Sequence, residues 1–187
     1  MDDRALRIGV LLAAHVVFLS AAALRILRGE RRHLLESRGP WWLEYYPPLV
    51  WLPFVAAYVG RTGLELADGL RLAGVAVAVG SALFAAWAMW SLGRSYGIRM
   101  DLFEGHRLMT TGPYRFVRHP MYLGILSFHI GATFALESLL LLAATALYVV
   151  PFTAARIVAE EKLLRAGFGA SHAAYVERVP PLVPFLR

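Results

Sequence analysis

Five stretches of mainly apolar residues follow one another along the chain, separated by shorter polar segments. They cover residues 8–24, 45–60, 72–92, 121–136 and 138–155. A helix needs about 17–25 predominantly apolar residues to cross the roughly 30 Å hydrocarbon core of a bilayer, and the five stretches reach or approach that length. The pattern therefore predicts an all-α, polytopic membrane protein with five transmembrane helices.

Proline and polar residues refine two of these predicted helices. The second stretch carries Pro47, Pro48 and Pro53. Because proline lacks the N–H that a helix interior needs, this helix is expected to begin irregularly and to kink at Pro53. The fourth and fifth stretches meet at Glu137 and Ser138, which predicts a tight helical hairpin with a polar tip.

Basic residues are distributed unevenly over the segments that join the helices. Of the 19 arginine and lysine residues, only Arg4, Arg7, Arg61 and Arg71 fall on one predicted side of the membrane, and the remaining 15 fall on the other. Because positive residues are enriched in cytoplasmic loops, the N-terminus is expected outside and the C-terminus in the cytoplasm. This topology explains the net charge of +6, so no nucleic-acid partner is expected.

Composition narrows the class of protein further. Only 17% of the 187 residues are charged and 58% are hydrophobic, whereas soluble domains carry about a quarter charged residues. Disordered proteins, coiled coils and ordinary cytosolic enzymes are excluded, and the lack of cysteine excludes thiol nucleophiles and disulfide scaffolds. We expect one membrane-embedded domain over residues 1–187, with three N-terminal helices in 1–92 and a C-terminal half in 93–187.

Two histidines lie inside predicted transmembrane helices, His15 in the first and His129 in the fourth. An ionisable residue within a membrane is a functional candidate by default. A single histidine in a helix bundle, however, is more often hydrogen-bonded to a neighbouring helix. We therefore interpret both histidines as structural.

Candidate chemistry is concentrated in the C-terminal half, on the predicted cytoplasmic side. Gly112 and Pro113 predict a turn, and Pro120 suits the first position of the fourth helix because its missing N–H costs nothing there. Arg118 and His119 then lie at a helix N-terminus, where free backbone N–H groups and the helix dipole favour an anion.

A second charged cluster, Arg156, Glu160 and Glu161, continues the fifth helix into the predicted cytoplasm. Arg156 and Glu160 are four residues apart and share a helix face. Since the fourth and fifth helices form a hairpin, this cluster is expected to meet Arg118 and His119 at one mouth of the bundle. The amphipathic, proline-rich segment 168–185 is predicted to fold over that mouth as a lid.

Together these motifs resemble the isoprenylcysteine carboxyl methyltransferase family over about residues 99–187, and integral-membrane phospholipid methyltransferases share a looser version. The matching residues are Thr111-Gly112-Pro113-Tyr114, Arg118-His119-Pro120-x-Tyr122-x-Gly124, Arg156-x-x-x-Glu160-Glu161, Phe168-Gly169, Tyr175, Val179-Pro180 and Pro184-Phe185. The resemblance implies a membrane methyltransferase that uses S-adenosyl-L-methionine and releases S-adenosyl-L-homocysteine. Its partners would be a lipid-like or prenylated small-molecule acceptor and the surrounding membrane lipids.

The resemblance also implies roles for individual residues. The cofactor pocket would be lined by Arg99, His106, Arg107, Leu108, Met109, Tyr114, His119, Pro120, Met121, Tyr122, Glu160 and Glu161. Within that pocket, Glu160 would hold the amino group of the cofactor, and Arg156 would be the catalytic residue that faces the acceptor. No metal site is expected. The family often has tyrosine where this chain has His172, so His172 receives no role.

The nature of the acceptor can be argued from proton chemistry. A carboxylate is already ionised at neutral pH and needs no general base, so the enzyme would align and desolvate the reactants. An amine acceptor must first lose a proton, and no additional base is evident near the site. This favours carboxyl O-methylation over phospholipid N-methylation. The sequence is also compatible with two further functions, an NADPH-dependent membrane sterol-type reductase and a non-enzymatic membrane scaffold.

Overall fold

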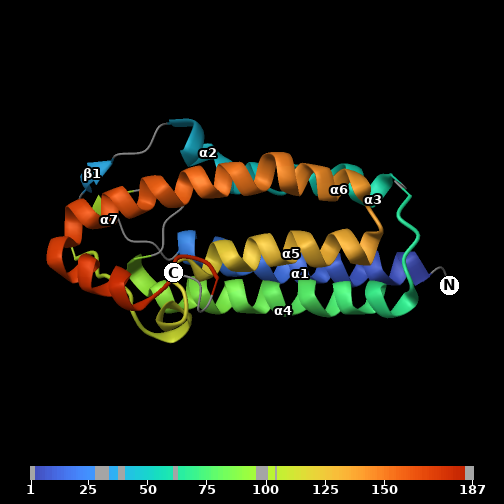
Figure 1. The fold of residues 1–187 in the computed structure, drawn as a ribbon, viewed down its shortest axis with the longest axis horizontal. Coiled ribbons are helices and arrows are strands. Elements are labelled where there is room, and N and C mark those ends of the chain that lie inside the picture. The colour runs from blue at the N-terminus through green and yellow to red at the C-terminus, as the bar shows by residue number, and fades with distance from the viewer. Residues whose placement is uncertain are drawn as a thin grey trace.

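The structure is a computed structural model that describes residues 3–27, 34–37, 41–60, 63–95, 101–103 and 105–183. Its helices run along one long axis in an elongated bundle (Figure 1). The helices are α1 (Asp3–Leu27), α2 (Trp41–Leu49), α3 (Leu52–Val59), α4 (Asp68–Leu92), α5 (Pro120–Leu136), α6 (Leu139–Ala144) and α7 (Val150–Arg178). The π-helical turn η3 (Thr145–Val149) joins α6 to α7, and the 3₁₀ turns η1 (Gly93–Ser95) and η2 (Gly112–Arg115) flank the segment between α4 and α5.

The helices form two groups (Figure 1). Helix α4 packs against both α1 and α5, whereas α2 contacts α7 and α3 contacts α6. The N-terminus, the connection from α3 to α4 and the turn from α5 to α6 lie at one end of the bundle, and the C-terminal segment lies at the other. The turns on either side of α5 therefore belong to opposite ends of the molecule.

Helices α4 and α5 approach each other closely because glycines line their contact. A Cβ atom added to Gly131 would lie 2.6 Å from the backbone nitrogen of Ala78, and one added to Gly74 would lie 2.6 Å from the carbonyl oxygen of Gly131. Both atoms belong to the backbone, so neither could move aside without the helix moving. Small residues at such a seam are a common basis of helix association in membranes.

The second apolar stretch is divided into α2 and α3, as its prolines predict. The expected irregular start is wrong, because α2 is helical from Trp41 and contains Pro47 and Pro48. The break instead falls at Val50 and Trp51. The proline ring fixes φ in the helical range, and its missing N–H releases the carbonyl four residues earlier without ending the helix.

The predicted hairpin between the fourth and fifth stretches is confirmed. Glu137 has a left-handed conformation with φ 54°, and the Ser138 hydroxyl accepts a hydrogen bond from the N–H of Leu141 at 3.1 Å, capping α6. The tip is polar, but its carboxylate faces the protein. Glu137 accepts hydrogen bonds from the N–H of Leu66 at 3.0 Å and from Arg7 at 3.4 Å.

The helix of the fifth stretch continues past residue 155 through Glu161, as predicted, and extends well beyond it. Helix continues from Leu139 through η3 to Arg178, with a kink at Gly169, whose φ and ψ are 47° and −120°. The structure also contains a short antiparallel strand pair, β1 (Leu34–Ser37) and β2 (Asp101–Phe103). The all-α prediction is right for the bundle and misses this pair, because it joins two connections that lie far apart in the sequence.

Membrane insertion is supported by length and composition. Three helical segments are long and apolar enough to span a bilayer, Asp3–Leu24, Asp68–Leu92 and Leu139–Arg178, and the apolar helices Tyr46–Val59 and Pro120–Leu136 are shorter. Large apolar side chains remain exposed along the bundle, which is characteristic of surfaces that face lipid. The chain is therefore a multi-pass membrane protein.

Candidate active site

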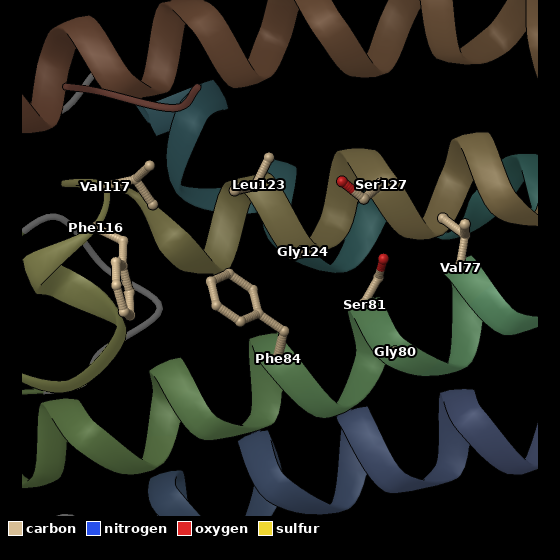
Figure 2. A pocket seen from close by; sticks show the side chains of 9 residues that line it. All are labelled: Val77, Gly80, Ser81, Phe84, Phe116, Val117, Leu123, Gly124 and Ser127. Carbon is tan, nitrogen blue, oxygen red and sulfur yellow. The ribbon is translucent and has the colours of Figure 1, made fainter. Parts of the chain in front are cut away.

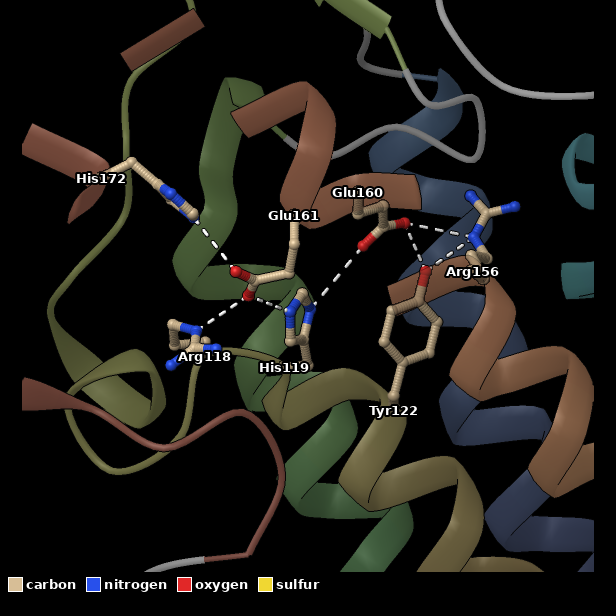
Figure 3. A network of polar contacts seen from close by, with 7 residues as sticks. All are labelled: Arg118, His119, Tyr122, Arg156, Glu160, Glu161 and His172. Atoms are coloured by element: carbon tan, nitrogen blue, oxygen red, sulfur yellow. Dashed lines mark hydrogen bonds and ion pairs between the residues drawn. The ribbon is translucent and has the colours of Figure 1, made fainter. Parts of the chain in front are cut away.

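The predicted clusters meet where the start of α5 lies beside α7. Seven polar side chains form one network there (Figure 3): Arg118, His119, Tyr122, Arg156, Glu160, Glu161 and His172. Tyr122 comes from the first turn of α5, Arg118 and His119 directly precede that helix, and the others come from α7. The hairpin brings these two stretches together, as expected from the sequence.

The inner half of the network is centred on Arg156, whose side chain is buried. Its Nε donates to the Tyr122 hydroxyl at 2.6 Å and to Glu160 Oε1 at 3.2 Å, which confirms the predicted pairing with Glu160 along the helix. Tyr122 in turn donates to Glu160. The Nη1 of Arg156 donates to the backbone carbonyl of Leu43 on α2. A third helix thus takes part in the site.

The outer half of the network is centred on Glu161. Its Oε1 accepts hydrogen bonds from Arg118 Nε at 2.8 Å and from His119 Nε2 at 2.7 Å. Burial by itself would raise the pKa of this carboxyl, but these hydrogen bonds and the charges of the same two partners lower it to about 2. Glu161 is therefore ionised throughout the physiological range and ties the first residues of α5 to α7.

His172 completes the outer half from the last part of α7. Its side chain is buried, and Nε2 lies 3.4 Å from Glu161 Oε2; among the described residues, neither ring nitrogen has a hydrogen-bond partner. Burial lowers the pKa of His172 first of all, and the positive charges of Arg118 and Arg165 add to this against the opposing effect of Glu161. The imidazole is therefore neutral at neutral pH.

The C-terminal segment is fastened over the start of α5. The backbone N–H groups of Arg118 and His119 donate to the carbonyls of Pro180 and Pro181 at 2.9 Å and 3.0 Å. The Tyr175 hydroxyl donates to the Tyr114 carbonyl at 2.6 Å. These two N–H groups therefore bind the chain's own carbonyls, whereas the expectation that the N-terminus of α5 favours an anion stays a prediction.

The loop that precedes α5 holds most of the remaining candidates. His106 is half-buried, with its ring centroid 5.7 Å from that of Phe168, and Arg107 is exposed with its backbone N–H donating to Ser95. Leu108, Met109 and Met121 are half-buried, and Tyr114 and Pro120 are buried. Arg99 lies outside the described residues.

An apolar groove with a volume of about 560 Å³ lies along the seam of α4 and α5 (Figure 2). Its lining comprises Val77, Gly80, Ser81, Phe84, Phe116, Val117, Leu123, Gly124 and Ser127. None of the seven network side chains belongs to this lining. The groove and the polar network are thus separate features of α5.

Two contributors to the site come from α2 and were not foreseen from the sequence. The Leu43 carbonyl accepts from Arg156, and the Tyr46 hydroxyl donates to the Val149 carbonyl at 2.9 Å beside the hydroxyl of Thr153. Pro47 could have indicated the first of these, because it has no N–H to donate to the Leu43 carbonyl four residues earlier. Within the described part of the chain, no group of three or more histidine, aspartate or glutamate residues could hold a metal ion.

Comparison with known proteins places this geometry in context. The model of the isoprenylcysteine carboxyl methyltransferase family matches residues 74–166. Protein-S-isoprenylcysteine O-methyltransferase B of Arabidopsis thaliana is 32% identical over 137 residues, which is 72% of this chain and 70% of the plant protein. The human protein-S-isoprenylcysteine O-methyltransferase is 28% identical over 139 residues, 73% of this chain and 49% of the human protein.

The fold is also similar to a solved structure of the eukaryotic intramembrane Ras methyltransferase ICMT. The TM-score is 0.58 and the sequence identity 25%, over 77% of this chain and 49% of that one. This chain thus spans about half the length of the human relative and of the solved eukaryotic enzyme, and 70% of the plant relative.

Proposed function

The chain belongs to the isoprenylcysteine carboxyl methyltransferase family, and from that premise we propose that it transfers a methyl group from S-adenosyl-L-methionine to the carboxylate of a lipid-like or prenylated acceptor. The observation that carries this proposal is the cluster of the buried Arg156 and Tyr122 with the half-buried Glu160 at one end of the bundle. It gathers a permanent cation, a hydroxyl and a carboxylate where a cytoplasmic cofactor and a membrane-borne acceptor can both arrive.

The carboxylate of Glu160 suits the amino group of the proposed cofactor. Glu160 Oε1 accepts from Tyr122 and Arg156, whereas Oε2 receives no hydrogen bond from the described residues and lies 3.8 Å from His119 Nδ1. A carboxylate oxygen of this kind suits the ammonium group of an amino acid. The wall of the pocket would consist of His106, Arg107, Leu108, Met109, Tyr114, His119, Pro120, Met121 and Tyr122. When bound, S-adenosyl-L-methionine supplies an electrophilic methyl group.

Arg156 is assigned to the acceptor. Its guanidinium stays charged at any physiological pH, so it can orient a carboxylate but cannot act as a base. None is required, because the acceptor carboxylate is already ionised at neutral pH. The work of the surrounding residues is then to align the acceptor oxygen and to exclude water from it.

Glu161 supports the pocket indirectly in this proposal. Its Oε1 accepts from Arg118 and His119, and Oε2 faces His172. Through these contacts Glu161 fixes the ring of His119, which would line the pocket. The C-terminal segment 176–183, bound to Arg118 and His119, would cover the pocket from the cytoplasmic side and form part of the single domain 1–187.

In the membrane, the proposed topology has five crossings with the N-terminus outside and the C-terminus in the cytoplasm. Two of the proposed crossings, α2 with α3 and α5 by itself, are short, so their lengths must be compared with the thickness of the bilayer. Residues 41–59 of α2 and α3 cover about 28 Å and α5 about 26 Å at 1.5 Å per residue, close to the thickness of the hydrocarbon core. The side with most basic residues would face the cytoplasm.

The test begins with calorimetric binding of S-adenosyl-L-homocysteine to the detergent-purified protein, with NADPH as the comparator. We expect micromolar binding of S-adenosyl-L-homocysteine and none of NADPH; the reverse would support a reductase. Transfer of a labelled methyl group is then measured in lipid nanodiscs with a farnesylated N-acetylcysteine and with phosphatidylethanolamine. Methylation of the farnesylcysteine alone supports a carboxylate acceptor, and methylation of phosphatidylethanolamine alone would overturn it.

A further inference from the structure

Two backbone carbonyls in the segment 43–50, those of Leu43 and Val50, lie within hydrogen-bond distance of side-chain nitrogens from other helices. The partner of the Leu43 carbonyl in a regular helix would be the N–H of residue 47, which is proline. That carbonyl instead accepts from Arg156 Nη1. Proline in α2 therefore creates an acceptor at the proposed active site.

The second carbonyl belongs to Val50, at the end of α2. Its regular partner would be the N–H of Phe54, but that group turns back to the Trp51 carbonyl at 3.1 Å. His129 Nε2 lies 3.0 Å from the Val50 oxygen, and the side chains of His129 and Val50 are fully buried. A buried carbonyl without a donor is costly in a membrane interior, where no water can replace the donor.

The position of the proton on the His129 ring follows from which of the two neighbouring carbonyls lacks another donor. Nδ1 lies 2.9 Å from the Ile125 carbonyl, and a neutral imidazole has one N–H to donate. The Ile125 carbonyl is four residues before His129 and is satisfied within α5, whereas the Val50 carbonyl lies outside any helical ladder. Nε2 is therefore the donor, and it donates to Val50. The ring is held in place by Trp51, which stacks on it with centroids 5.5 Å apart.

The residues that link the segment 43–50 to the rest of the bundle have the same spacing as two residues on α5. Leu43 on α2 and Val50, the residue directly after α2, are seven residues apart, and Tyr122 and His129 are seven residues apart on α5. Each pair spans about 10.5 Å of helix. Arg156 connects Tyr122 to the Leu43 carbonyl at one level, and His129 binds Val50 at the other. Both contacts, Arg156 with Leu43 and His129 with Val50, can form together only at one position of α2 along the axis of α5.

We propose that His129 is a positioning residue for methyl transfer, because it holds α2 at the height at which the Leu43 carbonyl meets Arg156. This inference rests on the proposed function. Without the His129 donor, the Val50 carbonyl has to find another partner, and α2 shifts along α5 and α7 to reach one. Arg156 then loses the acceptor that fixes its guanidinium, and a misplacement of about 1 Å at a reacting centre can cost a hundredfold in rate.

The first test compares His129→Leu with His129→Gln, whose amide N–H has the reach of Nε2. We expect kcat to fall at least tenfold in His129→Leu, with the KM for S-adenosyl-L-methionine within threefold, and to recover in His129→Gln. His15→Leu is the matched control, since His15 contacts the same Trp51 and Phe54 rings but forms no bond to α2 near the site. Its kcat is expected to stay within threefold of wild type.

A second readout does not depend on turnover. The chain has no cysteine, so Trp42→Cys and Phe152→Cys, whose native rings are 5.6 Å apart, report the position of α2 against α7 through a short bifunctional thiol reagent. We expect the cross-linking yield to fall with His129→Leu and to return with His129→Gln. If wild-type protein methylates no acceptor, the proposed function fails, whereas the cross-linking still tests whether His129 positions α2.

Unchanged kcat and unchanged cross-linking in folded His129→Leu would overturn the inference. Should that variant not fold, His129→Asn replaces it, because its amide is polar but too short to reach Val50. Equal kcat in His129→Asn and His129→Gln would then overturn the inference, and a loss in His129→Asn alone would support it.

Discussion

Adjacent carboxylates on α7 have different surroundings. Glu160 faces Tyr122 and Arg156, whereas Glu161 faces Arg118 and His119. Successive residues on an α-helix are rotated by about 100°, so neighbours in sequence meet different partners. Each residue can therefore be tested for a separate consequence.

Arg156→Lys keeps the charge but replaces a planar fork of donors with a single flexible ammonium. We expect kcat to fall by about a hundredfold, with the Kd of S-adenosyl-L-homocysteine within threefold, as measured by methyl transfer and calorimetry. The exposed Arg165 on the same helix provides the control Arg165→Lys, which is expected to behave as wild type. A normal kcat in Arg156→Lys would contradict the assignment.

Glu160→Gln removes the charge proposed to hold the cofactor's ammonium group and keeps the shape of the side chain. Hydrogen bonds to charged groups contribute about 1.5–3 kcal/mol, so the Kd of S-adenosyl-L-homocysteine is expected to rise at least tenfold in calorimetry. Glu177→Gln, an exposed position farther along α7, serves as the control. An unaltered Kd would remove Glu160 from the cofactor site.

Glu161 predicts a dependence of stability on pH. The folded-state pKa of about 2 lies below the unperturbed value of 4.5, so the stabilisation is complete above pH 4.5 and is lost as the pH falls towards 2. Glu161→Gln should therefore lower the free energy of unfolding by about 2 kcal/mol at pH 7, and the difference from wild type should shrink with acid. Thermal unfolding in detergent from pH 7 to pH 3 measures both. A difference that does not change with pH would contradict this origin.

At the scale of elements, the contact of α4 and α5 is the most sensitive to volume. A Cβ on Gly131 would meet the Ala78 nitrogen at 2.6 Å and the Gly74 carbonyl at 2.7 Å. Gly131→Ala is expected to destabilise the protein by about 1–3 kcal/mol, because the helices must separate. Gly80 on α4 has no atom within 4 Å of an added Cβ, so Gly80→Ala should be neutral or stabilising by up to about 1 kcal/mol. Equal effects of the two changes on thermal unfolding would contradict close packing.

Helix α5 is the element on which most features converge. Tyr122 faces Arg156 and Glu160 of α7 (Figure 3), and the groove residues Leu123, Gly124 and Ser127 lie towards α4 (Figure 2). His129 contacts the Val50 carbonyl directly after α2. Its first turn begins at Pro120, and the residue before it, His119, is bound through its N–H to the C-terminal segment. The placement of α5 therefore determines the polar network and the groove together.

At the scale of the whole molecule, the proposed orientation can be measured directly because the chain has no cysteine. The exposed Glu65 and Ala174 lie near opposite ends of the bundle. We expect Glu65→Cys to react with a membrane-impermeant maleimide on intact cells, and Ala174→Cys to react only after the membrane is permeabilised. The unmodified protein is the control. The opposite labelling pattern would reverse the topology.

Local physical chemistry made much of the fold predictable from the sequence. The apolar stretches, the hairpin at Glu137 and the start of α5 at Pro120 follow from periodicity and from the backbone properties of single residues. The pairing of Arg156 with Glu160 follows from helical spacing. The roles of the cofactor residues remain predictions, and Arg99 lies outside the described residues.

Only the tertiary structure decided the hydrogen-bond partners of the site residues, because many of those partners are backbone groups that every residue carries. The Leu43 and Val50 carbonyls belong to the backbone, and their partners Arg156 and His129 are 113 and 79 residues away. The Pro180 and Pro181 carbonyls likewise accept from the backbone N–H groups of Arg118 and His119, which precede α5. The sequence by itself determined which apolar stretches form helices and where the hairpin between the last two of them turns. Only their packing decided which backbone groups each charged side chain would meet, since those meetings require the whole chain to be folded.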